Sequence, residues 1–88
     1  MSLSSKHRKT LEAVFKDAVR SNVAWTDLER LFGALGADVS EGRGSRVRVD
    51  LGGVRAVFHR PHPQKETDKG ALRSVRRFLV EAGVEPEE

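Results

Sequence analysis

The sequence predicts a small α+β domain in which helices pack on one face of a three-stranded antiparallel sheet, in the order helix, helix, strand, strand, strand, helix. Two runs that alternate apolar and charged residues flank Gly52-Gly53, which is the pattern of a β-hairpin closed by a tight turn. The segments before and after these runs carry apolar residues at helical spacing. Because 88 residues leave room for only one small core, we expect a single domain over residues 1–88.

Two helices are expected before the sheet. The first spans about residues 5–20, and one apolar stripe defines it: Leu11, Val14, Phe15, Ala18 and Val19. The second opens at Thr26, where Thr26 and Glu29 have the spacing of a capping box, and it stops at Gly36. Trp25 precedes this helix, and we expect it to be a core residue rather than a base-stacking platform.

The sheet follows from the hairpin. A short first strand is expected over residues 37–40, and the turn 41–44 leads into the hairpin 45–60. If the turn holds only Gly52 and Gly53, one face is apolar, with the pairs Leu51 and Val54, Val49 and Ala56, and Val47 and Phe58. The other face is polar, with Asp50 opposite Arg55, Arg48 opposite Val57, and Arg46 opposite His59. A shift of register by one residue would separate these pairs.

A third helix ends the domain. Pro61 and Pro63 cannot donate ladder hydrogen bonds and therefore end the sheet. Asp68 or Thr67 can cap a helix that runs to about Ala82. Its buried stripe is expected to comprise Ala71, Leu72, Val75, Phe78, Leu79 and Ala82.

Composition narrows the class of function. The chain has no cysteine, which excludes disulfides, thiolate nucleophiles and cysteine zinc sites, and we expect no metal or cofactor. No apolar run approaches the length of a membrane span, so we expect a cytoplasmic protein with no membrane partner. Residues 41–79 hold ten Lys or Arg and four Asp or Glu. Such a basic segment favours a polyanion such as RNA, although solvated surface arginines give the same pattern.

The residues between 26 and 84 resemble a known family. Leu35-Gly36-Ala37, Gly44-Ser45, residues 57–63 (VFHRPHP), Lys65-Glu66 and residues 69–75 (KGALRSV) together look like the HicA toxins of toxin–antitoxin pairs. The resemblance implies a fold like that of double-stranded-RNA-binding domains, endoribonuclease activity on mRNA and neutralisation by a HicB antitoxin. The helix within residues 1–22 would be an N-terminal extension of this core.

The chain departs from the family at one position. HicA toxins typically carry a histidine directly after Gly-Ser, and here that residue is Arg46. Arginine stays charged and cannot serve as a general base, whereas the expected cross-strand neighbour His59 can exchange protons near neutral pH.

Three functions follow from these residues. In the first, the protein is an endoribonuclease that needs no metal, His59 is the general base or acid and Arg46 stabilises the transition state. Seven further residues would then contact phosphates: Arg43, Arg48, Arg55, Arg60, Lys65, Lys69 and Arg73. In the second, the same surface binds RNA or the antitoxin without catalysis, and His59 is an ordinary exposed strand residue. In the third, the basic face only binds an acidic antitoxin. His62, held between prolines, fits loop scaffolding better than catalysis.

Overall fold

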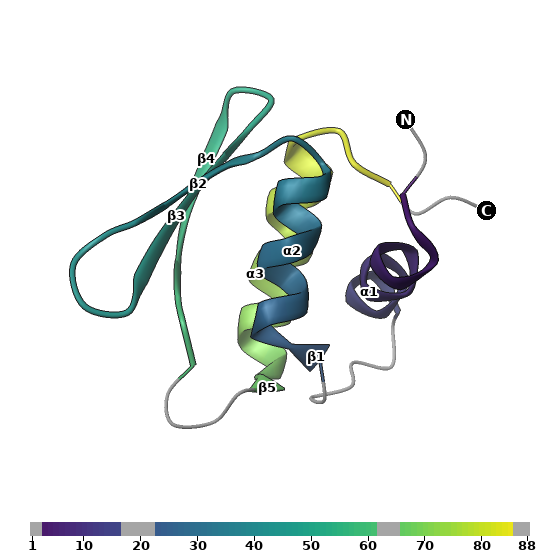
Figure 1. Cartoon of the computed structure of the whole chain (residues 1–88), viewed down its shortest axis with the longest axis horizontal. Coiled ribbons are helices and arrows are strands. Elements are labelled where there is room, and N and C mark those ends of the chain that lie inside the picture. Colours follow the sequence, from purple (N-terminus) through teal and green to yellow (C-terminus); the bar gives the residue numbers. More distant parts are fainter. Residues whose placement is uncertain (1–2, 17–22, 62–65, 86–88) are drawn as a thin grey trace.

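A sheet, a pair of helices and a further helix form three successive layers (Figure 1). The computed structural model describes residues 3–16, 23–61 and 66–85. Strands β2, β3 and β4 form an antiparallel sheet in that order, which α2 and α3 cover on one face, while α1 packs behind these two helices. The elements are α1 (Ser5–Phe15), β1 (Val23–Ala24), α2 (Trp25–Ala34), β2 (Asp38–Glu41), β3 (Arg46–Leu51), β4 (Val54–His59), β5 (Glu66–Thr67) and α3 (Lys69–Glu81). The predicted fold class and element order are confirmed.

The hairpin has the register that its sequence predicts. Leu51 pairs with Val54 across a two-residue turn, and Gly52 and Gly53 have φ values of 59° and 83°. Both angles lie in the left-handed region that a type I′ turn requires at its two central positions, and glycine adopts this region without steric cost. Because the turn fixes the register, every later pair of β3 and β4 follows from it, as far as Arg46 opposite His59.

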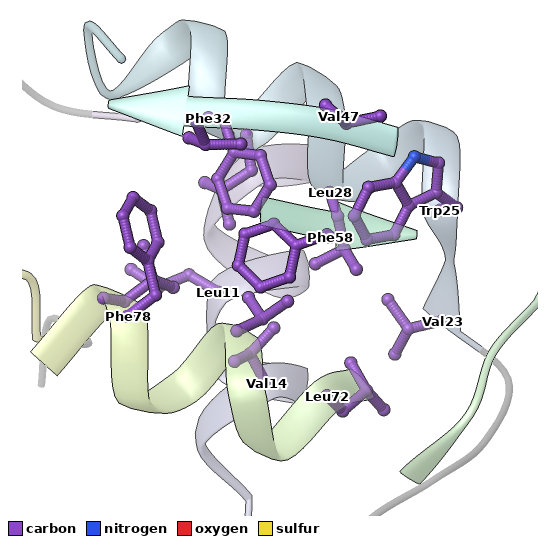
Figure 2. Packing of buried hydrophobic residues seen from close by; sticks show 14 residues of the cluster. Leu11, Val14, Val23, Trp25, Leu28, Phe32, Val47, Phe58, Leu72 and Phe78 are labelled. Carbon is purple, nitrogen blue, oxygen red and sulfur yellow. The ribbon is translucent and has the colours of Figure 1, made fainter. Parts of the chain in front are cut away.

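The core is centred on the aromatic ring of Phe58. This ring stacks on Phe32 at a centroid distance of 5.9 Å and meets the edge of Phe78 at 5.8 Å. Trp25 lies 5.9 Å away on another side (Figure 2). Trp25 is only 3% exposed, so its expected place in the core is confirmed and it offers no surface for stacking a base. Phe58 thus holds β4 against both helices directly before His59.

The first helix is shorter than its sequence pattern predicts. Its C-cap residue, Lys16, has an extended backbone conformation, so the expected continuation through residue 16 is wrong, and Ala18 and Val19 lie outside the described residues. Arg76 of α3 donates hydrogen bonds from Nε to the carbonyl of Val14 and from Nη2 to that of Lys16. An arginine at this end satisfies terminal carbonyls that have no partner within the helix. Leu11 and Val14 of α1 belong to the same buried cluster as the core of the sheet.

The expected capping box of the second helix does not form. The helix begins at Trp25, one residue before the expected cap, and Ala24 is its N-cap with no side-chain hydrogen bond. Glu29 instead binds Arg60 with both carboxylate oxygens. Because Ala24 is the N-cap, Glu29 lies five positions beyond it and is too far along the helix to complete a capping box, which pairs the N-cap with the third helical residue. At α3, by contrast, Asp68 accepts from the amide of Ala71 as predicted.

Two short strands join the ends of distant segments. Val23 pairs with Thr67 and Ala24 with Glu66, so the residues before α2 lie beside those before α3 (Figure 1). This two-stranded ladder was not expected from the sequence. None of the helices in the described ranges is long and apolar enough to cross a membrane.

Candidate nucleic-acid interface

The sheet leaves one face free of helices, which we call the outer face. Alternation along the three strands places eight side chains on it, and all of them except the half-buried Asp50 are exposed. They form three cross-strand rows. The first row is Arg46 and His59 beside Gly42, the second is Ser40, Arg48 and Val57, and the third is Asp38, Asp50 and Arg55.

Arg46 and His59 lie directly opposite each other at the open end of the hairpin. Both residues are exposed, and directly opposed side chains of an antiparallel pair have Cβ atoms about 4.5–5.5 Å apart. The amide of Arg60 donates to the carbonyl of Ser45 at 2.7 Å, so the ladder continues beyond this pair and does not fray at it. A permanently charged guanidinium therefore lies beside an imidazole on an accessible surface.

Gly42 keeps the space beside Arg46 open. Its amide donates to the carbonyl of Arg46 at 2.9 Å, so the two residues are neighbours across β2 and β3. A Cβ atom on Gly42 would lie 3.3 Å from the Cβ of Arg46 and 3.8 Å from Nε of Arg48. A side chain at this position would therefore be in tight contact with Arg46 and in ordinary contact with Arg48. Arg43 follows in the same turn and is exposed.

Arg60 is held by two carboxylates. Its Nη2 lies 2.9 Å from Glu29 of α2, and its Nη1 lies 3.0 Å from Glu41 at the end of β2. These hydrogen bonds, first that of Glu29 and then that of Glu41, raise the pKa of Arg60 above its already alkaline ordinary value. Arg60 therefore joins three elements around the first row of the outer face, and its hydrogen-bonding capacity is largely used within the protein.

The other expected phosphate contacts among the described residues lie in two different layers. Arg55 is on the outer face, where it forms an exposed ion pair of 3.1 Å with Asp50. Lys69 and Arg73 are exposed on α3, in the layer on the other side of the sheet. Lys65 and His62 lie outside the described residues. The structure thus brings Arg46, Arg48, Arg55 and His59 together on one face, with Arg43 in the adjoining turn, and does not bring Lys69 and Arg73 to that face.

The two carboxylates that bind Arg60 were not predicted from the sequence. Glu29 and Glu41 precede Arg60 by 31 and 19 positions, and no local pattern links residues at such separations. The only signal was the resemblance of Glu29 to a capping-box residue, and it pointed to a different contact. Among the residues in the three described ranges, no group of three or more His, Asp or Glu side chains is placed to hold a metal ion.

Comparison with known proteins identifies the chain at the level of the family. The family model described as "HicA toxin of bacterial toxin-antitoxin" matches residues 25–84, which is more than half of the chain and includes α2, the whole sheet and α3. Neither a curated protein nor a solved structure matches it. The matched region contains both residues of the first row and both carboxylates that hold Arg60, whereas α1 precedes it. The chain therefore belongs to the HicA toxin family, whose members are the toxins of bacterial toxin–antitoxin systems.

Proposed function

We propose that this toxin is an endoribonuclease that acts on mRNA, with His59 and Arg46 as its catalytic residues. The observation that carries the proposal is their direct cross-strand opposition on an exposed face. Imidazole can accept or donate a proton near neutral pH, and guanidinium can stabilise the charge that develops on a phosphate. The two groups together supply the parts that cleavage of RNA by its own 2′-hydroxyl requires.

The reaction divides between these two side chains. His59 accepts the proton of the 2′-hydroxyl as its oxygen attacks the adjacent phosphorus. Arg46 stabilises the additional negative charge on the phosphate oxygens in the transition state. The bond from phosphorus to the 5′-oxygen then breaks, and that oxygen takes up a proton, which His59 can return. The products are a 2′,3′-cyclic phosphate and a free 5′-hydroxyl.

Arginines around the first row would place the RNA strand. Arg43, Arg46 and Arg48 form no ion pair with any other described residue, so their charges are available to phosphates. Lys69 and Arg73 of α3, together with Lys65, would contact more distant parts of a longer RNA. Contacts of this kind position the strand without reading its sequence.

A second function has one specific observation in its favour. Arginine occupies the position at which the family typically carries histidine, so the outer face could bind RNA without cleaving it. The same basic surface also fits an acidic antitoxin, and we propose a HicB-like protein as the partner that covers it. Electrostatic complementarity of this kind would speed association and neutralise the toxin by blocking access of RNA.

The two functions separate in one experiment on the wild-type protein. Labelled mRNA is incubated with the protein in the presence and absence of a chelator, and both cleavage and the gel shift are followed. The endoribonuclease predicts new 5′-hydroxyl ends that the chelator does not suppress. A salt-dependent gel shift without cleavage would favour the binding function. Failure to bind RNA at any salt concentration would leave only the interaction with an antitoxin.

A further inference from the structure

The outer face has two chemically different ends. The first row carries Arg46 and His59, and the third row carries Asp38 opposite Asp50. Asp50 follows Arg46 by four positions on β3, which corresponds to about 13 Å along the strand. A strand of RNA lying along this face would have its phosphates attracted to the first row and repelled by the carboxylate of Asp38 in the third, where Arg55 offsets only the charge of Asp50. The third row is therefore suited to a part of RNA other than phosphate.

A depression lies over the second and third rows. It has a volume of about 270 Å³, and the outer-face residues that line it are Asp38, Ser40, Arg48, Asp50, Arg55 and Val57. Pockets for complete drug-sized ligands begin near this volume, so the depression suits a smaller group such as one nucleobase. Val57 is 57% exposed and offers an apolar surface to the face of a base.

The two carboxylates of the third row differ in their partners. Asp50 accepts a hydrogen bond from Nε of Arg55 at 3.1 Å. The side chain of Asp38 forms no hydrogen bond or ion pair with any residue in the described part of the chain, and it is exposed. Asp38 thus presents two free acceptor oxygens at the edge of the depression.

From this arrangement we propose that the depression binds a guanine base of the RNA and that Asp38 reads its Watson–Crick edge. The inference rests on the proposed function, because the base would neighbour the phosphate held by Arg46 and His59. Guanine is the only common RNA base with two adjacent donors on that edge, the N1–H and the N2 amino group. A carboxylate accepts both at once, as it does from arginine. Adenine, cytosine and uracil each place an acceptor beside their donor, and that acceptor would face the carboxylate.

The inference is tested by binding, apart from cleavage. The probes are short 2′-O-methyl oligouridines, which lack the attacking hydroxyl, with a single central guanosine, adenosine, cytidine or uridine. Fluorescence anisotropy is measured with the full chain, with Asp38→Asn and with Glu12→Gln. The last variant removes the same charge from an exposed residue of α1, on the far side of the helices from the sheet.

We expect the wild-type protein to bind the guanosine probe about tenfold more tightly than the uridine probe, as for a bidentate base contact. Asp38→Asn should remove this preference, because an amide presents one acceptor and one donor. Binding of the uridine probe should be no weaker than in the wild-type protein, because the variant also removes a carboxylate that repels phosphates. Glu12→Gln should keep the preference. Equal binding of all four probes by the wild-type protein, or a guanosine preference that survives Asp38→Asn, would overturn the inference and leave the proposed function standing. If none of the probes bound, the proposed function itself would fail, and the inference with it.

Discussion

Arg60 and Glu29 form a two-point contact between the end of the sheet and the second helix. Nε and Nη2 of Arg60 lie 3.3 and 2.9 Å from the two carboxylate oxygens of Glu29, although 31 positions separate the residues in the sequence. Glu41 accepts from the remaining nitrogen at 3.0 Å. The guanidinium therefore ties α2, β2 and the end of β4 together, next to the row that carries Arg46 and His59.

Arg60→Ala should lower the melting temperature by a few degrees and weaken RNA binding more than the loss of one phosphate contact would. The variant breaks both ion pairs and leaves Glu29 half-buried without its partner. Thermal unfolding measured by circular dichroism tests the first effect. Arg30→Ala is the matched control, because Arg30 is exposed on the same helix as Glu29. Equal melting temperatures of the two variants would show that the network contributes nothing.

The contribution of Arg60 should not change between about pH 7 and pH 9. Its pKa is raised by hydrogen bonds to Glu29 and then Glu41. A raised pKa gives stability that is complete below the unfolded-state pKa and is lost only as pH rises through the folded-state pKa. Both values lie above this range. The difference in melting temperature between the wild-type protein and Arg60→Ala should therefore be the same at both pH values, and a decrease at pH 9 would contradict the assignment.

Phe58→Ala should destabilise the protein by about 3–5 kcal/mol, the usual cost of removing a buried phenyl ring. Phe58 contacts Phe32, Phe78 and Trp25, so its loss leaves a cavity where the sheet meets both helices. Urea unfolding measures the effect. Val57→Ala is the control at the neighbouring position, because Val57 is 57% exposed and its truncation should cost less than about 0.5 kcal/mol. Similar losses of unfolding free energy in both variants would contradict the position of Phe58 at the centre of the core.

Gly42→Ala should reduce RNA binding severalfold with little change in stability. The added Cβ would lie 3.3 Å from the Cβ of Arg46, so Arg46 must shift by a few tenths of an ångström, and the methyl group would occupy part of the space beside its side chain. Gly33→Ala is the control in α2, where a Cβ would meet no atom within 4 Å. That substitution should raise the melting temperature, because alanine favours a helix interior over glycine, and it should leave RNA binding unchanged. Unimpaired RNA binding by Gly42→Ala would show that the open space beside Arg46 is not needed.

Arg48→Ala should weaken binding of every RNA sequence to a similar extent. The slope of the logarithm of the binding constant against the logarithm of the salt concentration should become less steep by the contribution of about one phosphate contact. Arg48 stands in the middle row of the outer face, and its Nε lies near Gly42. Titrations at several salt concentrations give the slope. Arg77→Ala removes an exposed arginine from α3, on the other side of the sheet, and should leave the slope unchanged. A larger change of the slope in Arg77→Ala than in Arg48→Ala would contradict the assignment of the outer face as the RNA-binding surface.

The sequence predicts the hairpin well because two local signals agree. Gly52-Gly53 sets the turn, and alternation separates Val47 and Val49 from Arg46 and Arg48. The ends of the helices are less predictable because distant residues decide them. Glu29 binds Arg60 of the sheet and does not cap its own helix, and Arg76 binds the carbonyls at the end of α1. The pairing of Val23 with Thr67 has the same origin, since contacts between distant segments leave no periodic pattern.

In the candidate site, too, the features that local signals determine were predictable and the others were not. The opposition of Arg46 and His59 follows from the turn and was predictable, as was the basic character of their face. The distribution of the remaining cations was not, because the number of arginines in a sequence does not tell which layer each will occupy. The structure separates Lys69 and Arg73 from the outer face and places Arg60 between two carboxylates.

The most direct test of the account is single-turnover cleavage of RNA by His59→Ala, with His7→Ala as the control. His7 belongs to α1, in the layer farthest from the sheet, so its loss should leave the rate unchanged. Removal of a general base typically costs about a hundredfold or more in rate, and we expect a loss of that size in His59→Ala while RNA affinity remains close to that of the wild-type protein. Cleavage by His59→Ala at the wild-type rate would remove His59 from the mechanism and contradict the central claim.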